Sequence, residues 1–447
     1  MYQKVNNETQ KKLIIVTQDY SGLGFAKRAT EELGYENVIL AYRMKDKEEN
    51  EECFDLVGNG IAEKMELDEL MENREDFRDW YFMWDGNHNY EDADLLRLEG
   101  FKVFGGMELQ DKMEHDRNFG MELVKQAGLD TLPYQEFNNP QDGIDYLEQN
   151  QDKAFVFKPD AGEGCYTTYV PDHEDDHEAN EELRKYMTSL DDDGTTYILQ
   201  ERIKGLEYNI EAWIYKGKPV FAFVCLESKR KLNKDEGEMV GCSQDVSFVV
   251  PLEAKILKNT VYKLLPHIPE DYTGFLDCNI LNKDKKDYFI EFCARFGYNA
   301  HPNLFWNLAI SPFTEILFDL MDGNIDDFYR HFRYGFGSSV TLYIDHPRKG
   351  LPFHKDKDLH GHFYHFDTYR EYDEWGDPEY YLAGYANEVG IVCAHGFTIK
   401  ESAKECLRLA DKIHFPMHAM RSDLDKNDYP TEPGGRYMAL VSMDYLE

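Results

Sequence analysis

The sequence has 447 residues, which is too long for a single compact domain. Hydrophobic residues make up 42% of it and aromatic residues 14%, which is enough apolar surface to bury sizeable cores. Its 86 acidic and 49 basic side chains give a formal net charge of −37, which disfavours broad binding to nucleic acid because phosphates are repelled at long range. The first residues lack the apolar run of a secretory signal, and no stretch of about 18 apolar residues could cross a membrane, so we expect a cytoplasmic protein.

The eight cysteines are scattered along the chain, and none forms a C-x-x-C pair. This spacing argues against a disulfide framework and against a zinc ribbon, and it fits a reducing compartment. We expect most of these thiols to fill cores.

The first part of the chain alternates strand and helix patterns, which predicts a parallel sheet and a Rossmann-like domain over residues 1–108. The turn Ser21–Gly24 invites a dinucleotide-binding interpretation, but the motif would need glycine where Lys27 stands. The expected strands are at 11–17, 37–43, 80–84 and 101–106, and the expected helices are at 25–34 and 90–100.

The rest of the chain predicts two further domains of mixed character, so the fold class is α/β in an α+β multi-domain arrangement. Residues 109–325 contain a helical pattern at 111–128 and two hairpins, at 207–227 and 273–297. Residues 326–447 form the expected mixed C-terminal domain. Its expected strands are at 338–344, 362–369, 388–396 and 436–443, around an amphipathic helix at 398–413.

The second hairpin carries polar residues in otherwise apolar strands. Asp277 and Asn279 share one face of the first strand, because side chains alternate along a strand. Glu291 lies in an apolar run on the second strand, where a carboxylate is costly to bury unless it is paired or metal-bound. The residues alone leave two alternatives open: a magnesium site made of hard oxygen ligands, or an ion pair between Glu291 and Arg295.

Three further short segments bear on nucleotide binding. Lys158 ends an apolar strand before the glycine loop at 160–164, where an ammonium and backbone N–H groups could cradle phosphates. Glu207 follows Gly205 by two residues, in a position suited to ribose hydroxyls. Lys229 and Arg230 form a basic pair in an acidic chain, and by themselves they would be interpreted as a solvated surface pair.

The order of these motifs resembles that in glycinamide ribonucleotide synthetase, also called phosphoribosylamine–glycine ligase, an ATP-grasp enzyme. The most specific matches are E-x-x-x-G-x-E at 201–207 and YTGFL followed by IEF-x-x-RFG, between 272 and 297. Similar wording at 100–106, and at 362–369, 391–405 and 421–424, extends the resemblance over nearly the whole chain. The resemblance implies a Rossmann-like domain, an ATP-grasp body with a lid at about 130–203, and a mixed C-terminal domain.

The resemblance also implies a role for individual residues. The residues that would contact ATP are Arg117 and Lys158 at its phosphates, Glu201 and Ile203 at adenine through their backbone, and Glu207 at the ribose. The residues that would act on the reacting groups are Glu291 for Mg²⁺, and Arg295, Lys229 and Arg230 for the transferring phosphoryl group.

This sequence departs from the family pattern at the metal site. Cys293 stands where the family has an asparagine that follows its metal-binding glutamate, and a thiol is a poor magnesium ligand. Asp277 could restore the missing oxygen, with Asn279 beside it.

The substrate-side motifs are also altered. The family's Gly-Pro-Glu is replaced by 85–87, the Asp-Pro-Glu after its Arg-Phe-Gly by 298–300, and its glycine-rich stretch by 235–245. We therefore expect an ATP-dependent ligase that joins a small carboxylate, such as an amino acid, to an amine other than phosphoribosylamine. The alternatives are a genuine phosphoribosylamine–glycine ligase of purine biosynthesis, a non-catalytic nucleotide-binding relative, and a nicotinamide-dependent oxidoreductase built on the first domain.

Overall fold

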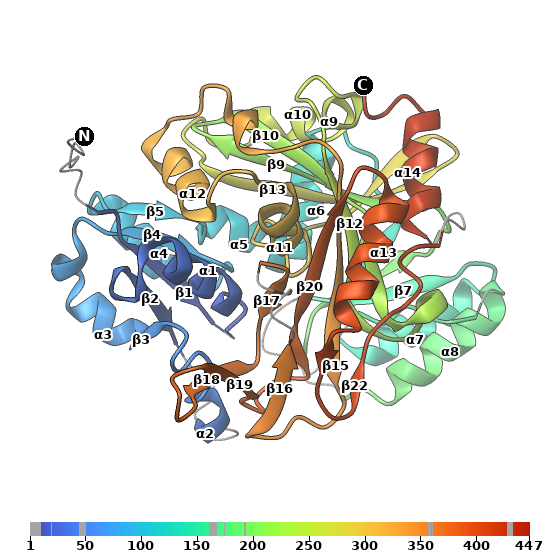
Figure 1. Cartoon of the computed structure of the whole chain (residues 1–447). Helices are drawn as coiled ribbons and strands as arrows, with labels where there is room; N and C mark the ends of the chain where they lie inside the picture. The colour runs from blue at the N-terminus through green and yellow to red at the C-terminus, as the bar shows by residue number, and fades with distance from the viewer. Residues whose placement is uncertain are drawn as a thin grey trace. The chain divides into compact units, whose positions relative to one another are not determined.

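The computed structural model divides into two compact units, which are described separately. The first unit comprises residues 1–108, 243–249 and 295–425, and the second comprises 109–242, 250–294 and 426–447. The expected C-terminal domain is therefore shared between the two units. None of the helices described is long and apolar enough to cross a membrane. The structure describes residues 10–18, 20–43, 51–160, 168–173, 175–191, 194–355, 359, 361–426 and 432–447 (Figure 1).

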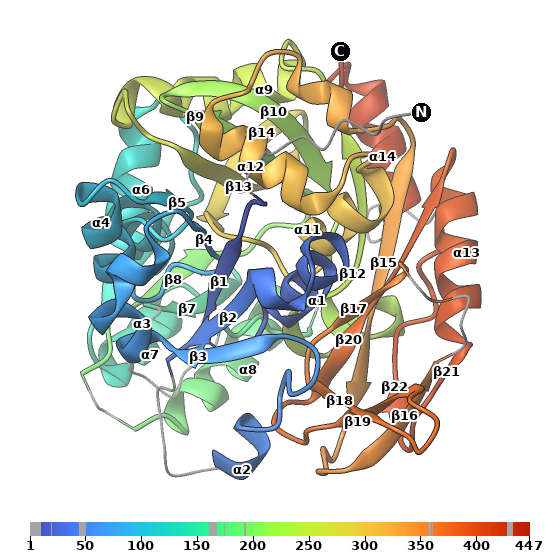
Figure 2. The same ribbon diagram turned by 60° about the vertical axis from the view of Figure 1, so that its left-hand side comes forward.

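The first unit opens with the expected parallel sheet, in the order β3-β2-β1-β4-β5 (Figure 2). Strands β1, β2 and β4 are almost wholly buried, as apolar strands of a parallel sheet are when both faces are covered. Strand β3 was not expected, because its sequence EKME is polar and lies at the sheet edge. The elements are β1 (Leu13–Thr17), α1 (Leu23–Leu33), β2 (Val38–Tyr42), α2 (Glu51–Phe54), β3 (Glu63–Glu66), α3 (Leu67–Glu72), β4 (Tyr81–Trp84), α4 (Tyr90–Leu98) and β5 (Lys102–Phe104).

The first unit continues with antiparallel strands. Residues 243–249 of β12 (Glu236–Val249) pair with β15 (Phe336–Ile344), which pairs with β20 (Glu388–Gly396). Helix α13 (Ile399–Ala410) packs on β15 and β20 and begins with a capping box. The other elements are α11 (Ala300–Asn303), α12 (Phe313–Asp322), β16 (Leu351–Lys355), β17 (Phe363–His365), β18 (Thr368–Tyr372), β19 (Pro378–Leu382), β21 (Ile413–His414) and β22 (His418–Ala419).

A three-stranded antiparallel sheet in the second unit falls within the expected lid. Its order is β6-β8-β7, and helices α7 (Pro140–Gln149) and α8 (Asp176–Thr188) cover one face. Phe157 and Leu199 pack against these helices. Because side chains alternate along a strand, Lys158 and Ile198 face the other way. The strands are β6 (Tyr134–Phe137), β7 (Phe155–Pro159) and β8 (Tyr197–Glu201).

A second group of strands in this unit contains the two expected hairpins. The order is β14-β13-β9-β10, and the first hairpin turns at Lys216 and Gly217, both of which have positive φ. The helix expected at 111–128 is two helices, because the Asp116 side chain accepts a hydrogen bond from Phe119 N–H and starts a new one. The elements are α5 (Glu108–His115), α6 (Arg117–Gln126), β9 (Leu206–Tyr215), β10 (Lys218–Cys225), β11 (Ser228–Leu232), α9 (Lys255–Asn259), α10 (Val261–Leu264), β13 (Gly274–Lys283) and β14 (Lys286–Phe292).

The strand expected at 436–443 was wrong, because this segment lies in helix α14 (Pro433–Ser442) of the second unit. Residues 437–441 form a short, continuous apolar run, which is consistent with a buried strand as well as with a buried helix. Arg436 and Leu440 are buried one helical turn apart, and Pro433 occupies the first turn, where proline favours a helix start. Packing against β9 thus decides between two periodicities that the short segment leaves open.

A buried ion pair in the first unit gives a test of this fold. The Arg421 guanidinium donates to both carboxylate oxygens of Asp423, at 2.9 and 2.8 Å, and the Arg421 side chain is fully buried. We expect Asp423→Asn to lower the free energy of unfolding by about 3–5 kcal/mol, because it leaves a buried guanidinium charge uncompensated.

The matched control is Glu405→Gln, which breaks the half-exposed Arg408–Glu405 pair and should cost less than about 1 kcal/mol. Urea denaturation of both variants measures the difference. Equal effects of the two substitutions would contradict the structural role of the buried pair.

Candidate functional site

Lys229 of β11 lies between two carboxylates in the second unit. Its Nζ is 3.0 Å from Glu207 Oε1 and 3.1 Å from Glu291 Oε1. Burial favours the neutral amine, but the two carboxylates outweigh it and hold the pKa of Lys229 well above its ordinary value. The three side chains come from β9, β11 and β14, so the sheet brings together residues far apart in the sequence.

Glu291 is the most strongly held carboxylate of this cluster. Burial by itself raises its pKa, but Lys229, Lys158 and Arg117 together move the pKa far below the ordinary value for glutamate. Its Oε2 lies 3.6 Å from Arg117 Nη1, while the Arg117 Nε donates to Pro159 O at 2.8 Å. Glu291 is therefore ionised at neutral pH and is available as a hard oxygen ligand.

Lys158 brings a buried positive charge to the cluster. The residue is 5% exposed, and its Nζ has no hydrogen-bond partner among the described residues. Burial lowers the pKa of Lys158 to about 8, although Glu291 pulls in the other direction. A buried ammonium without a hydrogen-bond partner is costly, which makes Lys158 a candidate for binding an anion. The expected glycine loop at 160–164 lies outside the described residues from 161 onward.

Asn279 is the residue that faces Glu291 directly. The two pair across β13 and β14, and Asn209 of β9 stands opposite Asn279 on its other side. The buried Asn279 Nδ2 donates to Glu207 Oε1 at 3.0 Å, and its Oδ1 has no partner within the described part of the chain. Carboxylate and amide oxygens thus converge here, as a magnesium site requires.

Asp277 lies two residues earlier on β13 and pairs with Glu211 of β9. Its backbone oxygen accepts from Cys293 N–H at 3.2 Å, so Asp277 and Cys293 are neighbours, as the substitution of the family's asparagine suggested. Asp277 is 7% exposed. Its part in a metal shell stays a prediction, since Asn279 and not Asp277 is paired with Glu291.

Arg230 points away from its neighbour Lys229. Its guanidinium donates to Gly237 O at 2.7 Å and Val170 O at 3.0 Å, and it lies 2.8 Å from Asp172 Oδ1. Strand alternation explains the divergence, because successive side chains of β11 face opposite ways. The guanidinium thereby anchors the segment that follows the glycine loop.

The residues predicted to contact adenine and the acyl phosphate are not in the cluster around Lys229. Glu201 ends β8, its N–H donates to Pro133 O at 2.8 Å, and its carboxylate pairs with Lys153 at 3.0 Å. Ile203 lies between β8 and β9, outside regular structure. Arg295 belongs to the first unit, where its guanidinium lies 5.1 Å from the ring centre of Tyr298.

Sequence reasoning missed two polar members of the cluster. Asn209 Nδ2 donates to Glu227 Oε2 at 3.3 Å, and the Glu227 charge adds to the forces that raise the pKa of Lys229. A signal was present, because Glu207, Asn209 and Glu211 recur with period two in the apolar strand β9. Position 205 requires glycine, because a Cβ there would lie 2.4 Å from Asn282 O.

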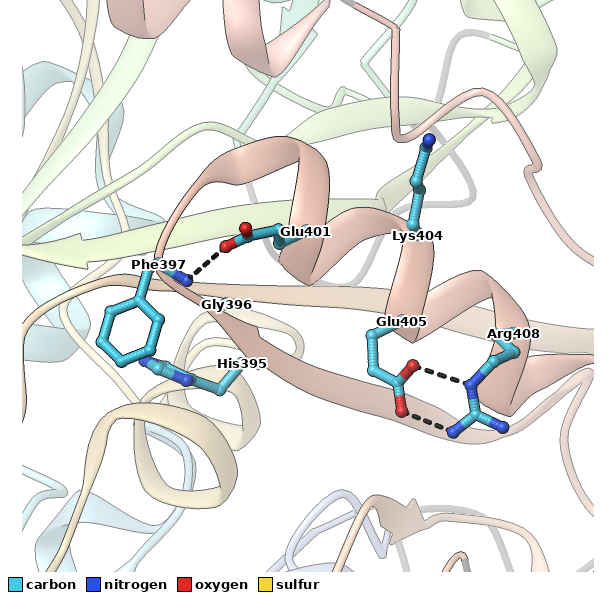
Figure 3. Close-up of a pocket in the computed structure, with 7 residues that line it drawn as sticks. All are labelled: His395, Gly396, Phe397, Glu401, Lys404, Glu405 and Arg408. Carbon is cyan, nitrogen blue, oxygen red and sulfur yellow. Dashed lines mark hydrogen bonds and ion pairs between the residues drawn. The ribbon is translucent and has the colours of Figure 1, made fainter.

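Two other groups of residues in the first unit have features of a binding site. Glu315, Asp319 and His331 lie close enough to hold a metal, but Arg330 Nη2 is already 2.7 Å from Asp319 Oδ2. A hollow of about 510 Å³ beside α13 is shown in Figure 3. Its lining includes the paired Glu405 and Arg408, and Glu401, which accepts from Phe397 N–H. Neither matches the cluster around Lys229 in unpartnered buried charge.

Comparison with known proteins agrees with this geometry. Residues 115–300 match the ATP-grasp (A) domain of phosphoribosylglycinamide synthetase. The phosphoribosylamine–glycine ligase of Clostridium acetobutylicum is 23% identical over 360 residues, which are 74% of this chain and 80% of that protein. The Haemophilus influenzae ligase is 21% identical over 74% of this chain and 79% of its own length.

Two solved structures show the fold. The Thermotoga maritima phosphoribosylamine–glycine ligase has a TM-score of 0.66 at 15% identity, covering 92% of this chain and 99% of its own. The biotin carboxylase domain of Hydrogenobacter thermophilus 2-oxoglutarate carboxylase, solved with MgADP, has a TM-score of 0.61 at 12% identity, covering 98% and 99%. The expected α/β fold with a Rossmann-like first sheet is confirmed.

The buried charge of Lys158 predicts an unusual pH dependence of stability. The folded protein releases this proton near pH 8, whereas the unfolded chain keeps it to about pH 10.4, so stability should rise with pH between these values. Lys158→Met should abolish that rise and should raise the free energy of unfolding at pH 7 by about 1–3 kcal/mol.

Denaturation of the ligand-free protein between pH 6.5 and about 10 measures both effects. Lys153→Met is the matched control, because Lys153 is half-exposed and should change stability by less than about 1 kcal/mol. Destabilisation at pH 7 by Lys158→Met would contradict the assignment of a strained, unpartnered ammonium.

Proposed function

We propose that this chain, whose residues 115–300 match the ATP-grasp (A) domain of phosphoribosylglycinamide synthetase, activates a small carboxylate with ATP and transfers the acyl group to an amine. The products would be an amide, ADP and phosphate. The observation that carries the proposal is the partly buried cluster of Lys158, Lys229, Glu207 and Glu291, in which cations and hard oxygen ligands lie close together.

The residues of the cluster divide the work of phosphoryl transfer. Lys158 and Arg117 would bind the phosphates, and Glu207 would accept from the ribose hydroxyls. Glu291 and Asn279 would hold Mg²⁺, which supplies neutralisation of phosphate charge when it is bound. Lys229 would keep its positive charge near the transferring group, because the neighbouring carboxylates stabilise the ammonium.

No side-chain nucleophile is needed in this reaction. The substrate carboxylate attacks the γ-phosphorus and ADP leaves, and the amine then attacks the acyl carbon and phosphate leaves. The protein contributes position and charge neutralisation, which are the main sources of catalysis in phosphoryl transfer. Arg295 would steady the acyl phosphate, and the placement of its guanidinium beside Tyr298 is compatible with an aromatic or nucleoside-like acceptor.

The amine acceptor is proposed to differ from phosphoribosylamine. Asp85 follows β4 at the carboxyl edge of the parallel sheet, and its Oδ2 accepts from Thr17 and Ser21 hydroxyls at 2.6 and 2.7 Å. This edge, at the point where strand order reverses, is where open α/β sheets bind ligands. A carboxylate there disfavours a phosphate-bearing amine by charge repulsion.

A second altered motif supports the same proposal. The family's acidic position after Arg-Phe-Gly is the aromatic Tyr298, which is 41% exposed. Its neighbour Asn299 is fully buried. The Asn299 Nδ2 donates to the Ser339 hydroxyl at 3.1 Å, and the Thr341 hydroxyl donates to Asn299 Oδ1 at 3.0 Å. These contacts give Asn299 a structural role in place of a substrate contact.

Two alternatives remain distinct from this proposal. A genuine phosphoribosylamine–glycine ligase is favoured by the relatives, which carry that name. A non-catalytic nucleotide-binding relative is suggested by Cys293, but the two carboxylates gathered at Lys229 argue for turnover. The two are separated from the proposal by the products formed.

The test of function supplies the purified protein with ATP, Mg²⁺ and glycine, together with freshly generated phosphoribosylamine or with a panel of aromatic and nucleoside-like amines. We expect amine-dependent release of ADP with a member of the panel, and a mass that equals acid plus amine less water. Glycinamide ribonucleotide formed at about 1 per second or faster would restore the family reaction instead.

A Glu291→Gln variant serves as the control, since it retains shape and loses the charge that holds the metal. It should lose ADP release with every acceptor. Absence of ADP release from the wild-type protein with all acids and amines, at saturating ATP, would favour the non-catalytic alternative.

A further inference from the structure

The side chain of Arg436 reaches behind the charge cluster from helix α14. The residue is 3% exposed, although α14 is close to the C-terminal end of the sequence. Its Nη1 donates to Glu227 O at 2.8 Å and to Glu207 O at 3.2 Å, and its Nη2 donates to Leu226 O at 3.0 Å. A single guanidinium thus binds three backbone carbonyls in the second unit.

These carbonyls come from two separate segments that carry functional side chains. Glu207 is at the beginning of β9, whereas 226–227 connect β10 to β11 just before Lys229. The distance between the two segments sets the 3.0 Å contact of Lys229 Nζ with Glu207 Oε1. Because a guanidinium is planar and presents its donors in a fixed fork, it can set this spacing more rigidly than a flexible amine could.

We propose that Arg436 is a positioning residue for the nucleotide–magnesium site, acting through Glu207 and Lys229 without touching the reacting groups. This inference rests on the proposed function. It gives the C-terminal helix a part in ATP binding, because Arg436 ties the start of β9, which carries Glu207, to the segment just before Lys229.

The opposing interpretation is that Arg436 only packs helix α14 onto the sheet. In that case its loss would lower stability, and ATP affinity would fall only as far as the folded fraction falls. Under the positioning role, affinity falls in protein that is fully folded. The two roles are therefore separated by measuring thermal stability and ATP affinity on the same preparations.

The experiment measures ATP binding by isothermal titration calorimetry in excess Mg²⁺, below the melting temperature of each variant. For Arg436→Met we expect the dissociation constant to rise roughly 10- to 100-fold, as for groups that orient ligands from behind. Arg436→Lys keeps the stem and the charge, so it should melt near wild type yet fail to restore affinity, because an ammonium lacks the fork.

The matched control is Arg421→Met, which removes another buried arginine, one that lies in the first unit and bonds Asp423. It should lower the melting temperature and leave the ATP dissociation constant within about threefold of wild type. That change is well short of a factor of ten, which corresponds to about 1.4 kcal/mol. Low-millimolar guanidinium ion should recover ATP affinity in Arg436→Ala and should not change it in Arg421→Ala.

Each outcome decides one claim. Wild-type affinity in folded Arg436→Met, or loss of affinity that tracks stability equally in Arg436→Met and Arg421→Met, would overturn the positioning role and leave the proposed function standing. Failure of the wild-type protein to bind ATP with Mg²⁺ would instead overturn the proposed function.

Discussion

The contact of Lys229 with Glu207 and Glu291 is the interaction on which the site depends. It joins β9, β11 and β14, and it holds an ammonium in its charged form at a place where burial alone would neutralise it. Two carboxylates so close together would repel each other without that cation. The ion triad therefore keeps both glutamates ionised and aimed into one volume, which is a precondition for binding a divalent cation there.

As the proposed nucleotide site, the same cluster would explain how a chain of net charge −37 can receive a polyanion. Long-range repulsion is overcome locally, because Lys158, Arg117 and Lys229 gather in a partly buried region where Coulomb interactions are screened less than at the surface. Lys158 is costly to bury, since no described group accepts a hydrogen bond from its Nζ. We interpret this cost as stability given up so that the ammonium meets an incoming phosphate without first breaking an ion pair.

Much of this arrangement could be predicted from the sequence, and the reason lies in strand periodicity. Apolar runs that end in Lys158 or enclose Glu291 fix which residues are on strands, and the period of two then fixes which side chains share a face. The two hairpins were predicted for the same reason. The parallel sheet followed from alternating strand and helix patterns, with only its polar edge strand β3 missed.

The parts that could not be predicted depend on tertiary contacts. Nothing near Arg230 in sequence says that its guanidinium binds Val170 O, and nothing near Arg436 says that it reaches Leu226 O from a different part of the chain. The strand expected at 436–443 was wrong because a short apolar run fits both a strand and a buried helix until packing selects one. Register posed a similar problem, since only the paired strands reveal that Asn279, and not Asp277, faces Glu291.

The central claim is that this cluster is a site for ATP together with Mg²⁺, and the dependence of ATP affinity on the metal tests it most directly. Calorimetric titration of the wild-type protein with ATP, once in excess Mg²⁺ and once with a chelator, gives the comparison. Without the metal, no divalent cation would offset the repulsion between the oxygens of Glu291 and Asn279 and the phosphate oxygens, so we predict affinity at least about tenfold weaker, or 1.4 kcal/mol. Equal or tighter binding in chelator would contradict the claim.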